Sequence, residues 1–486
     1  MKHFHTWIGT LILFAACKGP QTPVLPMPEF TGFNTEVTAD AAVITVSHKG
    51  DYGIVEAGIY LGAGKRIKAD ALDPGQFTVS VSGLEPSTTY TYKAFISSGL
   101  QEVTSQEQAF TTAAAPKVVA TGNGAYTIWT ENTLLQEILT EWKLNPGDIE
   151  HLTIIGSLDK EDFVYIRNKM KRLKSMDLRE TALTVLPNQA FAFSGIESVE
   201  LPDGLEEIGQ SAFESCELLS GVFRFPKNLK VIGVDAFAQC HNLEGIELPD
   251  GLERILNYSF RYCDQLGGKL VLPESLLEIG EYAFEGTAFH GDLVIPRNVK
   301  IIPTGTFSNA GFDGGITLPE GLTEVGALAF ADNQFQGELK LPDGLHTIGE
   351  AAFYNTGFAG PLKLPATLNI IGDSAFQGNS FSGELVIPEG IREIPSFVFA
   401  DSAHMQQYER VVLHKNVERI RNGAFATSSE TLKEVICFAE EPPVYEEDAF
   451  NSDAVPTITL YVPASSVQRY QEAEGWKGFG SIKSIE

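Results

Sequence analysis

A phenylalanine that follows a small residue returns at almost constant spacing along the C-terminal part of the chain. Successive spacings lie between 22 and 26 residues, and most of them are 23 or 24. Self-similarity at this period is typical of a solenoid, in which each repeat is one coil that buries its apolar face only by stacking on its neighbours. The repeated positions are Phe191, Phe213, Phe237, Phe260, Phe284, Phe307, Phe330, Phe353, Phe376, Phe399, Phe425 and Phe450.

A second ladder, of prolines, runs in phase with the phenylalanines, and each proline closes a short Leu-x-Leu-like segment. These prolines are Pro202, Pro226, Pro249, Pro273, Pro296, Pro319, Pro342, Pro365 and Pro388. In one such coil, Leu339 and Leu341 are expected to point inward from a strand, because alternate strand residues face opposite sides. Pro342 lacks an amide donor and should end that strand. Gly349 should permit a sharp bend, and Phe353 should fill the centre of the coil.

Small residues, most of them polar or thiols, stand three positions after these phenylalanines. They are Cys216, Cys240, Cys263, Thr287, Ala310, Asn333, Thr356 and Asn379. A small polar side chain at this place can satisfy backbone groups of a turn inside the coil. We therefore interpret the three stacked cysteines as buried structural residues, with a metal site formed by their thiols as the alternative. Cys437 is expected to be a core residue rather than a reactive thiol.

The whole unit, Leu-Pro-x-Gly-Leu-x-x-Ile-Gly-x-x-Ala-Phe, resembles the repeat of the BspA-like leucine-rich repeat family of bacterial surface proteins. The match runs from about Thr181 to Val462. The resemblance implies a mainly β fold, a leucine-rich-repeat solenoid over residues 181–462 with about 12 coils of ~23 residues. It also implies a role in binding rather than in catalysis.

Both ends of a solenoid expose apolar faces and need caps. Residues 118–180 read as an N-terminal cap with divergent first repeats, in which Thr133 to Gln136 can form a capping box. The buried face of the helix that follows would comprise Leu135, Ile138, Leu139 and Trp142. Residues 463–486 resemble the family's C-terminal cap, with a helix capped by Ser465 or Ser466. Its inward residues would be Val467, Tyr470 and Trp476.

The first residues have the pattern of a bacterial secretory signal, residues 1–17. Lys2 precedes an apolar run from Trp7 to Ala16, which is too short to span a bilayer. The end of this run resembles a lipobox, and the resemblance implies that Cys17 is lipidated. Ordinary signal cleavage near Ala16, with release of a soluble protein, is the alternative. Residues 18–29 are rich in proline and read as an extended tether.

Short strand-like runs separated by Gly, Pro and Asp fill residues 30–112 and predict a small β-sandwich. The segment Leu84-Glu-Pro-Ser-Thr-Thr-Tyr90 resembles the signature of fibronectin type III domains. The resemblance implies that Tyr90 forms a tyrosine corner, in which its hydroxyl bonds upstream backbone. Residues 113–117 are expected to be a linker.

The chain is acidic, with 63 acidic and 35 basic residues and a formal net charge of -28. This charge repels nucleic-acid phosphates and anionic lipid surfaces, so we expect no nucleic-acid partner and membrane contact only through the lipid. The sequence contains no zinc-protease, P-loop, nucleophile-elbow or EF-hand motif, so we expect no enzyme and no cofactor. Glycosidase carboxylates have no short motif, so sequence alone leaves them open.

The Leu-x-Leu register predicts which residue of each coil faces outward. The last four of these, Val386, Val412, Ile436 and Tyr461, are apolar, and contiguous exposed apolar surface often marks an interaction site. A cap, a flanking loop or coil curvature that covers them is the alternative. Lys340 and Lys363 are outward neighbours and a second candidate binding surface, unless they pair with Glu338 and Glu384.

We hypothesise a non-enzymatic binding or adhesion protein, anchored by lipid in the bacterial cell envelope, at the outer membrane or cell surface. The solenoid would present its outward ladder to an extracellular protein or glycan. A structural or accessory subunit of an envelope complex, for example in nutrient capture, is the alternative hypothesis.

Overall fold

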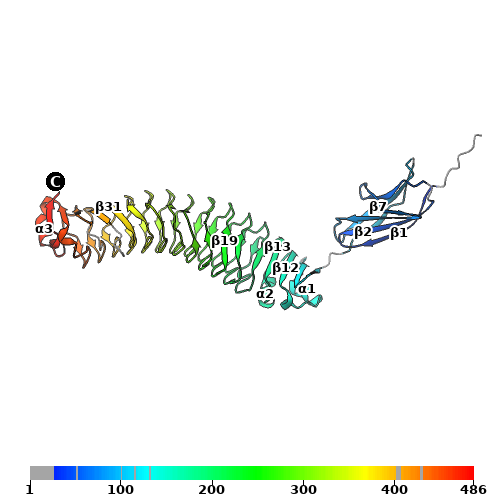
Figure 1. The fold of residues 1–486 in the computed structure, drawn as a ribbon, viewed down its shortest axis with the longest axis horizontal. Helices are drawn as coiled ribbons and strands as arrows, with labels where there is room; N and C mark the ends of the chain where they lie inside the picture. Colours follow the sequence, from blue (N-terminus) through cyan, green and yellow to red (C-terminus); the bar gives the residue numbers. More distant parts are fainter. Residues whose placement is uncertain are drawn as a thin grey trace, which may run out of the picture. The chain divides into compact units, whose positions relative to one another are not determined.

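A computed structural model describes residues 27–50, 53–99, 101–113, 117–130, 133–400, 407–426 and 431–485. The predicted leader, Cys17 and most of the predicted tether lie outside these ranges. The chain divides into two compact units, Met1–Pro116 and Lys117–Glu486. Figure 1 shows the first in blue and the second from cyan to red.

Two antiparallel sheets face each other in the first unit, which confirms the predicted β-sandwich. One sheet has the strand order β1 (Glu29–Val37), β2 (Ala41–Lys49), β6 (Gln76–Ser82) and β5 (Ala71–Asp73). The other runs β4 (Lys65–Lys68), β3 (Glu56–Leu61), β7 (Thr89–Ser97) and β8 (Glu102–Thr104), and β9 (Gln108–Thr111) also pairs with β7. Alternate residues such as Ile44, Val46 and Val79 are fully buried between the sheets, as strand periodicity requires.

The tyrosine corner is present in this unit. The Glu85 backbone N–H donates a hydrogen bond of 2.8 Å to the Tyr90 hydroxyl, and the Tyr90 ring stacks on Phe110 with 5.7 Å between centroids. This bond fixes the entry of β7 against the preceding loop. It favours the fibronectin type III interpretation, which rests on the short Leu84–Tyr90 signature.

The second unit begins with a sheet that already has the solenoid's parallel order. Its strands are β10 (Val118–Gly122), β11 (Ala125–Trp129), β12 (His151–Gly156), β13 (Ser175–Thr181) and β15 (Ser198–Glu200). Only the β10–β11 pair is antiparallel, which gives the solenoid a hairpin at its first edge. The divergent segment therefore adds coils of its own, and the described solenoid has about 14 turns rather than the 12 counted from the phenylalanines.

The predicted capping box at Thr133 is wrong. Helix α1 (Leu135–Glu141) has Leu134 as its N-cap, without a side-chain cap. Instead Asp162 Oδ1 accepts the Leu135 N–H at 2.7 Å, while Asp162 also forms a reciprocal capping box with Asp159 at the start of α2 (Lys160–Lys169). One buried carboxylate thus serves two helices, and desolvation raises its pKa. Trp142 lies outside α1 and is 44% exposed rather than inward, whereas the other three predicted residues are buried.

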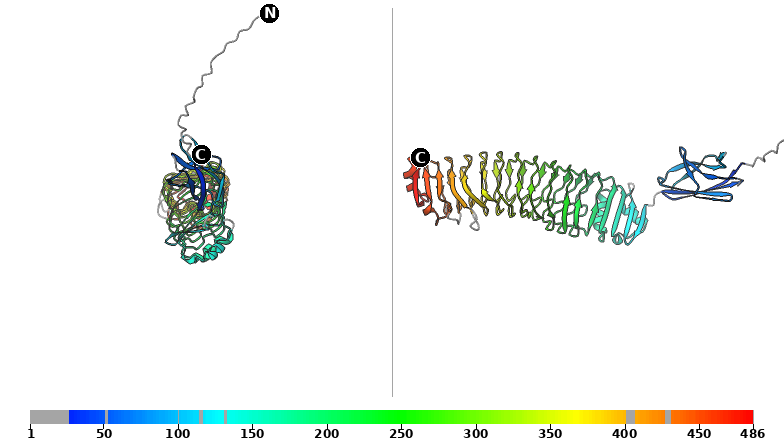
Figure 2. Two further views of the ribbon diagram at one scale, coloured as in Figure 1. Left: turned by 90° about the vertical axis from the view of Figure 1, so that its right-hand side faces the viewer. Right: turned by 45° about the horizontal axis from the view of Figure 1, so that its top comes forward.

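Two stacks of parallel strands run along the rest of the unit, where Figure 2 shows successive coils side by side. The short-strand stack contributes two residues per coil: β14 (Val185–Leu186), β16 (Glu207–Ile208), β18 (Val231–Ile232), β20 (Arg254–Ile255), β22 (Glu278–Ile279), β25 (Ile301–Ile302), β27 (Glu324–Val325), β28 (Thr347–Ile348), β30 (Ile370–Ile371), β32 (Glu393–Ile394), β34 (Arg419–Ile420) and β36 (Val444–Tyr445). In each of these strands the second residue is the more buried or equally buried one, so this stack closes one side of the core.

The second stack contains the residues that were predicted to face outward, and its strands are less regular in length than those of the short-strand stack. It comprises β17 (Gly221–Arg224), β19 (Leu243–Glu247), β21 (Gly267–Gly268), β23 (Ala288–Phe289), β24 (Leu293–Val294), β26 (Ile316–Thr317), β29 (Ala359–Pro361), β31 (Ser380–Val386), β33 (Gln407–Leu413), β35 (Glu434–Cys437), β37 (Thr459–Val462) and β38 (Ser481–Ser484). The predicted strand through Leu339 and Leu341 is absent. Inward and outward side chains still alternate in this segment: Leu339 is buried and Lys340 is exposed.

The phenylalanine ladder forms the centre of the core, as predicted. Its rings are at most 1% exposed, and consecutive centroids lie between 4.8 and 5.7 Å apart from Phe191 to Phe450. Phe289, Phe312, Phe335 and Phe358 build a second stack beside it, at 5.1 to 5.9 Å. With roughly 1.5–3 kcal/mol for each buried ring, these two ladders contribute a large share of the stabilisation.

Gly349 plays a different part from the one predicted. Its φ lies outside the left-handed region, so it makes no bend that requires glycine. A Cβ there would lie 2.4 Å from Ala327 N and 2.7 Å from Gly326 C. Gly349 is therefore needed because the coil packs its backbone directly on the backbone of the preceding coil.

The C-terminal end is closed by aromatic side chains. Helix α3 (Val467–Glu472) is flanked by the 3₁₀ turns η3 (Ala464–Ser466) and η4 (Trp476–Gly478), while η1 (Pro146–Asp148) and η2 (Val455–Thr457) lie elsewhere in the unit. Tyr470 and Trp476 are fully buried and donate to the carbonyls of Ala439 and Pro443 at 2.9 and 2.8 Å. Ser466 is the N-cap residue, but its hydroxyl bonds Glu440 O instead of the helix.

Candidate functional site

The structure brings the four predicted outward residues of the last coils into one column. Val386 pairs in register with Val412, Val412 with Ile436, and Ile436 with Tyr461, all in the sheet β29-β31-β33-β35-β37-β38. We refer to these four residues as the apolar column. Val386 is 48% exposed, and the other three are half-buried. Val386 is more exposed because the preceding coil contributes no strand residue opposite it.

A charged column runs beside the apolar column, two residues earlier in each strand. It consists of Glu384, Arg410 and Glu434, again in direct register, and Thr459 occupies the same position in the next strand. Arg410 lies between two carboxylates, 2.5 Å from Glu434 and 3.1 Å from Glu384. The hydrogen bond to Glu434, and after it the one to Glu384, raises the pKa of Arg410. Arg410 was not among the predicted residues, since these included only one outward position per coil; the alternation along Gln407–Leu413 also places Arg410 outward.

Two hollows flank these columns. One, of about 590 Å³, is lined by charged and polar residues at the beginning of the strands: Glu384, Glu409, Arg410, Thr431, Lys433 and Glu434. The other, of about 540 Å³, lies past the strand ends and includes Phe438, which is 42% exposed, and Pro442 and Pro443. The outward face of the last coils therefore carries an apolar stripe with a polar hollow on one side and a hollow of mixed lining on the other, a composition suited to binding.

Lys340 and Lys363 are exposed, as predicted, but no strand pairing joins their coils at these residues. Glu384, a predicted partner of these lysines, pairs with Arg410 instead. Within the described ranges, no ion pair joins either lysine to a carboxylate. The two lysines thus form a separate and less organised surface than the apolar column.

The three stacked cysteines have the structural role expected of them. Each thiol is fully buried and donates to the carbonyl of a ladder phenylalanine: Cys216 to Phe191, Cys240 to Phe213 and Cys263 to Phe237, at 3.0 to 3.1 Å. Burial raises the pKa of Cys216 to about 12 and that of Cys240 well above its ordinary value.

Cys437 is also buried, as predicted. Its sulfur lies 3.2 Å from the Tyr470 hydroxyl in the C-terminal cap, and burial raises the pKa of its thiol. No three His, Cys, Asp or Glu side chains gather as metal ligands in the part of the chain that the structure describes. The helices in this part are all too short or too polar to cross a bilayer.

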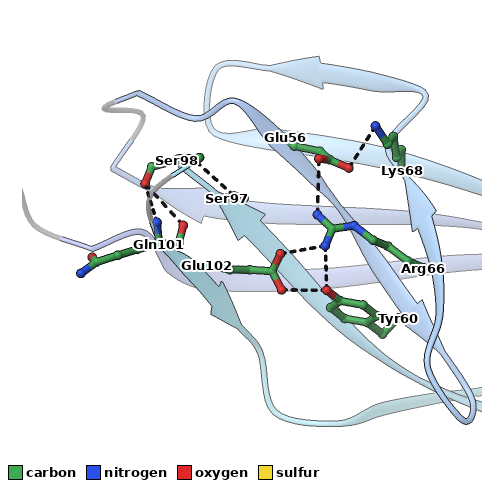
Figure 3. A network of polar contacts seen from close by, with 9 residues as sticks. Glu56, Tyr60, Arg66, Lys68, Ser97, Ser98, Gln101 and Glu102 are labelled. Atoms are coloured by element: carbon green, nitrogen blue, oxygen red, sulfur yellow. Dashed lines mark hydrogen bonds and ion pairs between the residues drawn. The ribbon is translucent and has the colours of Figure 1, made fainter.

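A polar network on the first unit had no sequence signal. Arg66 on β4 donates to Tyr60 on β3 at 2.8 Å and to Glu102 on β8 at 3.0 Å, and its guanidinium lies 4.0 Å from the Phe95 ring centre. Figure 3 shows how Glu56 completes the network with Arg66 and Lys68. These ion pairs are partly exposed, so we assign them to cross-linking strands rather than to chemistry.

Comparison with known proteins supports the repeat interpretation. The profile of the BspA type leucine rich repeat region matches residues 172–313 and 314–461. A search among curated proteins returned no significant match.

Several solved structures are similar to the chain. A leucine-rich repeat protein from Bacteroides ovatus is 16% identical, with 77% of this chain and 99% of that chain covered and a TM-score of 0.46. A leucine rich cell surface protein from Faecalibacterium prausnitzii is 17% identical over 74% and 95%, with a TM-score of 0.33. The pneumococcal vaccine antigen PcpA is 19% identical over 70% and 80%, with a TM-score of 0.35. The profile match spans more than half of the residues, so the chain belongs to the BspA-type leucine-rich repeat family.

Proposed function

We propose that this chain is a non-enzymatic binding or adhesion protein of the bacterial cell surface, which presents the outward face of its last coils to an extracellular protein or glycan. The observation that carries the proposal is the apolar column. Four apolar side chains stand in register on a face where side chains normally meet water. The charged column and the polar hollow beside it supply the polar surroundings typical of an interface.

The family assignment supports the surface location, since the F. prausnitzii relative is described as a cell surface protein. We propose that a lipid on Cys17 anchors the chain in the envelope, at the outer membrane or cell surface. An alkynyl fatty acid fed to producing cells should label the protein, and Cys17→Ala should abolish the labelling. Continued labelling of Cys17→Ala would contradict lipidation of Cys17 and would leave the binding proposal unaffected.

Binding is tested with an array of glycans and extracellular-matrix proteins, probed with residues 18–486. We expect a specific hit that weakens at least about tenfold in the double variant Val412→Asp and Ile436→Asp, because a charge at the centre of an apolar contact removes its main contribution. Val271→Asp is the matched control, since Val271 occupies the same outward position in an earlier coil and is 75% exposed.

All variants must first show the same thermal unfolding as the parent. A hit that the double variant leaves unchanged would exclude the apolar column as the contact surface. The absence of any hit would favour the accessory role in an envelope complex. In that case, deletion of residues 30–112 should abolish complex assembly.

A further inference from the structure

One backbone hydrogen bond recurs between neighbouring coils of the short-strand stack. In most coils the residue that follows the short strand donates its N–H to the carbonyl of the inward residue one coil earlier, and we call this bond a rung. Gly326 donates to Ile302 at 2.7 Å, Gly349 to Val325 at 2.8 Å and Gly372 to Ile348 at 2.9 Å. The same rung joins Gly209 to Leu186, Gly233 to Ile208, Leu256 to Ile232, Gly280 to Ile255, Arg421 to Ile394 and Glu446 to Ile420.

Proline occupies the donor position in two coils, at Pro303 and Pro395. Proline has no N–H, so neither residue can form a rung. No donor within the described ranges reaches the carbonyls of Ile279 or Ile371. The short-strand stack stops at the same two places, between β22 and β25 and between β30 and β32.

The loss of glycine at the donor position does not account for these interruptions. Leu256, Arg421 and Glu446 also carry a Cβ at the donor position, and each of them still forms its rung. Pro187 provides a second comparison: it follows β14, the first strand of the stack, where no preceding strand offers a carbonyl. A proline after the first strand of the stack therefore removes no rung, whereas a proline after a later strand does.

The phenylalanine ladder continues across both interruptions. The ladder rings stay stacked, with 5.5 Å between Phe284 and Phe307 and 5.7 Å between Phe376 and Phe399. On the opposite side, β29, β31 and β33 pair without a gap past Pro395. The opening is thus confined to one face.

At Pro395 the interruption also exposes part of the core. Ile371 is 8% exposed there, whereas Ile348 and Ile394 on either side are 0% and 1% exposed. A hollow of about 500 Å³ lies at this place, lined among others by Ile370, Asp373, Arg392 and Pro395. Neighbouring coils that keep their rungs bury the same residue completely.

We propose that Pro303 and Pro395 create two hinge lines, at which the solenoid opens on its short-strand face while the aromatic core and the opposite sheet hold the coils together. The hinge at Pro395 lets the last coils, which carry the apolar column, tilt against the earlier ones. The proposal stands on the backbone alone and does not depend on what the apolar column binds.

Hydrogen–deuterium exchange of residues 18–486 tests the hinges. Peptides that cover residues 389–394 should exchange about tenfold faster than those that cover the equivalent residues 366–371 one coil earlier. The reason is that the backbone amides of residues 389–394 have no hydrogen-bond partner among the described residues of the preceding coil. Equal exchange in the two segments would overturn the proposal. Pro395→Ala restores the N–H and should slow exchange in residues 389–394 about tenfold.

Pro361→Gly removes a proline that is exposed and takes no part in the rungs, and it is the control. If Pro361→Gly slows exchange at residues 389–394 as much as Pro395→Ala does, or if neither does, the hinge is refuted. The converse variant, Gly349→Pro, should open a third hinge between β27 and β28. A folded Gly349→Pro protein with unchanged exchange at residues 343–348 would refute it as well.

Discussion

In several of the described coils, the residue three positions after the ladder phenylalanine closes the turn of its coil from the inside. Asn379 illustrates this: its amide donates to the carbonyls of Phe353 and Phe376 at 2.7 and 3.0 Å and accepts from Phe358 N–H at 3.2 Å. In other coils a thiol or a hydroxyl makes fewer of these bonds. The position therefore requires a small side chain, and in most coils that side chain also forms hydrogen bonds to buried backbone groups.

Asn379→Ala should lower the free energy of unfolding by about 2–4 kcal/mol, since it leaves several buried backbone groups without partners. Guanidinium-induced unfolding measures this loss. Asn369→Ala is the control: Asn369 is exposed, and its replacement should change stability by less than about 0.5 kcal/mol. A loss at Asn379 no larger than that at Asn369 would show that water replaces the amide.

The buried cysteines should be unreactive in the native protein. Because burial raises the pKa values of Cys216, Cys240 and Cys437, their thiols stay protonated near about pH 8, and the thiolate is the reactive form. Ellman's reagent should therefore detect no thiol in native residues 18–486 and all four after denaturation. Rapid reaction of any cysteine in the folded protein would mean that its coil opens.

At the scale of the elements, glycine sets how closely two coils approach. Gly349→Ala places a methyl group against the backbone of Ala327 and Gly326, and should destabilise the solenoid by about 1–3 kcal/mol. Gly344→Ala in the same coil meets only Glu320 O at 3.6 Å and should be neutral or stabilising by about 0.4–1 kcal/mol. Thermal unfolding of the two variants should shift in opposite directions, and equal shifts would contradict the close-packing role.

Features that repeat in the sequence could be predicted from it. The period placed the phenylalanine core and the outward register, and both are confirmed. The capping of α1 by Asp162 could not be predicted, because it joins residues far apart in the chain and only one coil uses it. The same holds for the position of Arg410 between Glu384 and Glu434: the ion pairs depend on strand register across three coils. The missing strand at Leu339 follows from no local residue preference.

At the scale of the molecule, the division into two units predicts two unfolding transitions. Tyr90→Phe removes the acceptor for the Glu85 N–H and should cost about 1 kcal/mol, which lowers the melting temperature of a domain of this size by about 4–8 °C. Calorimetry of residues 18–486 should show this shift in one transition only. A shift of both transitions would mean that the units unfold together.

Each repeat coil supplies one phenylalanine to the core ladder and one residue to the outward face, and this has a consequence for the gene. Recombination between two coils in the same phase removes or duplicates a whole coil and leaves both caps in place. The molecule would lengthen or shorten in steps of about 4.8 Å, the spacing of neighbouring strands. The surviving columns keep their neighbours except at the joint. The number of coils determines the length of the solenoid, and the outward side chains determine what it binds. These two properties can therefore change separately over evolutionary time.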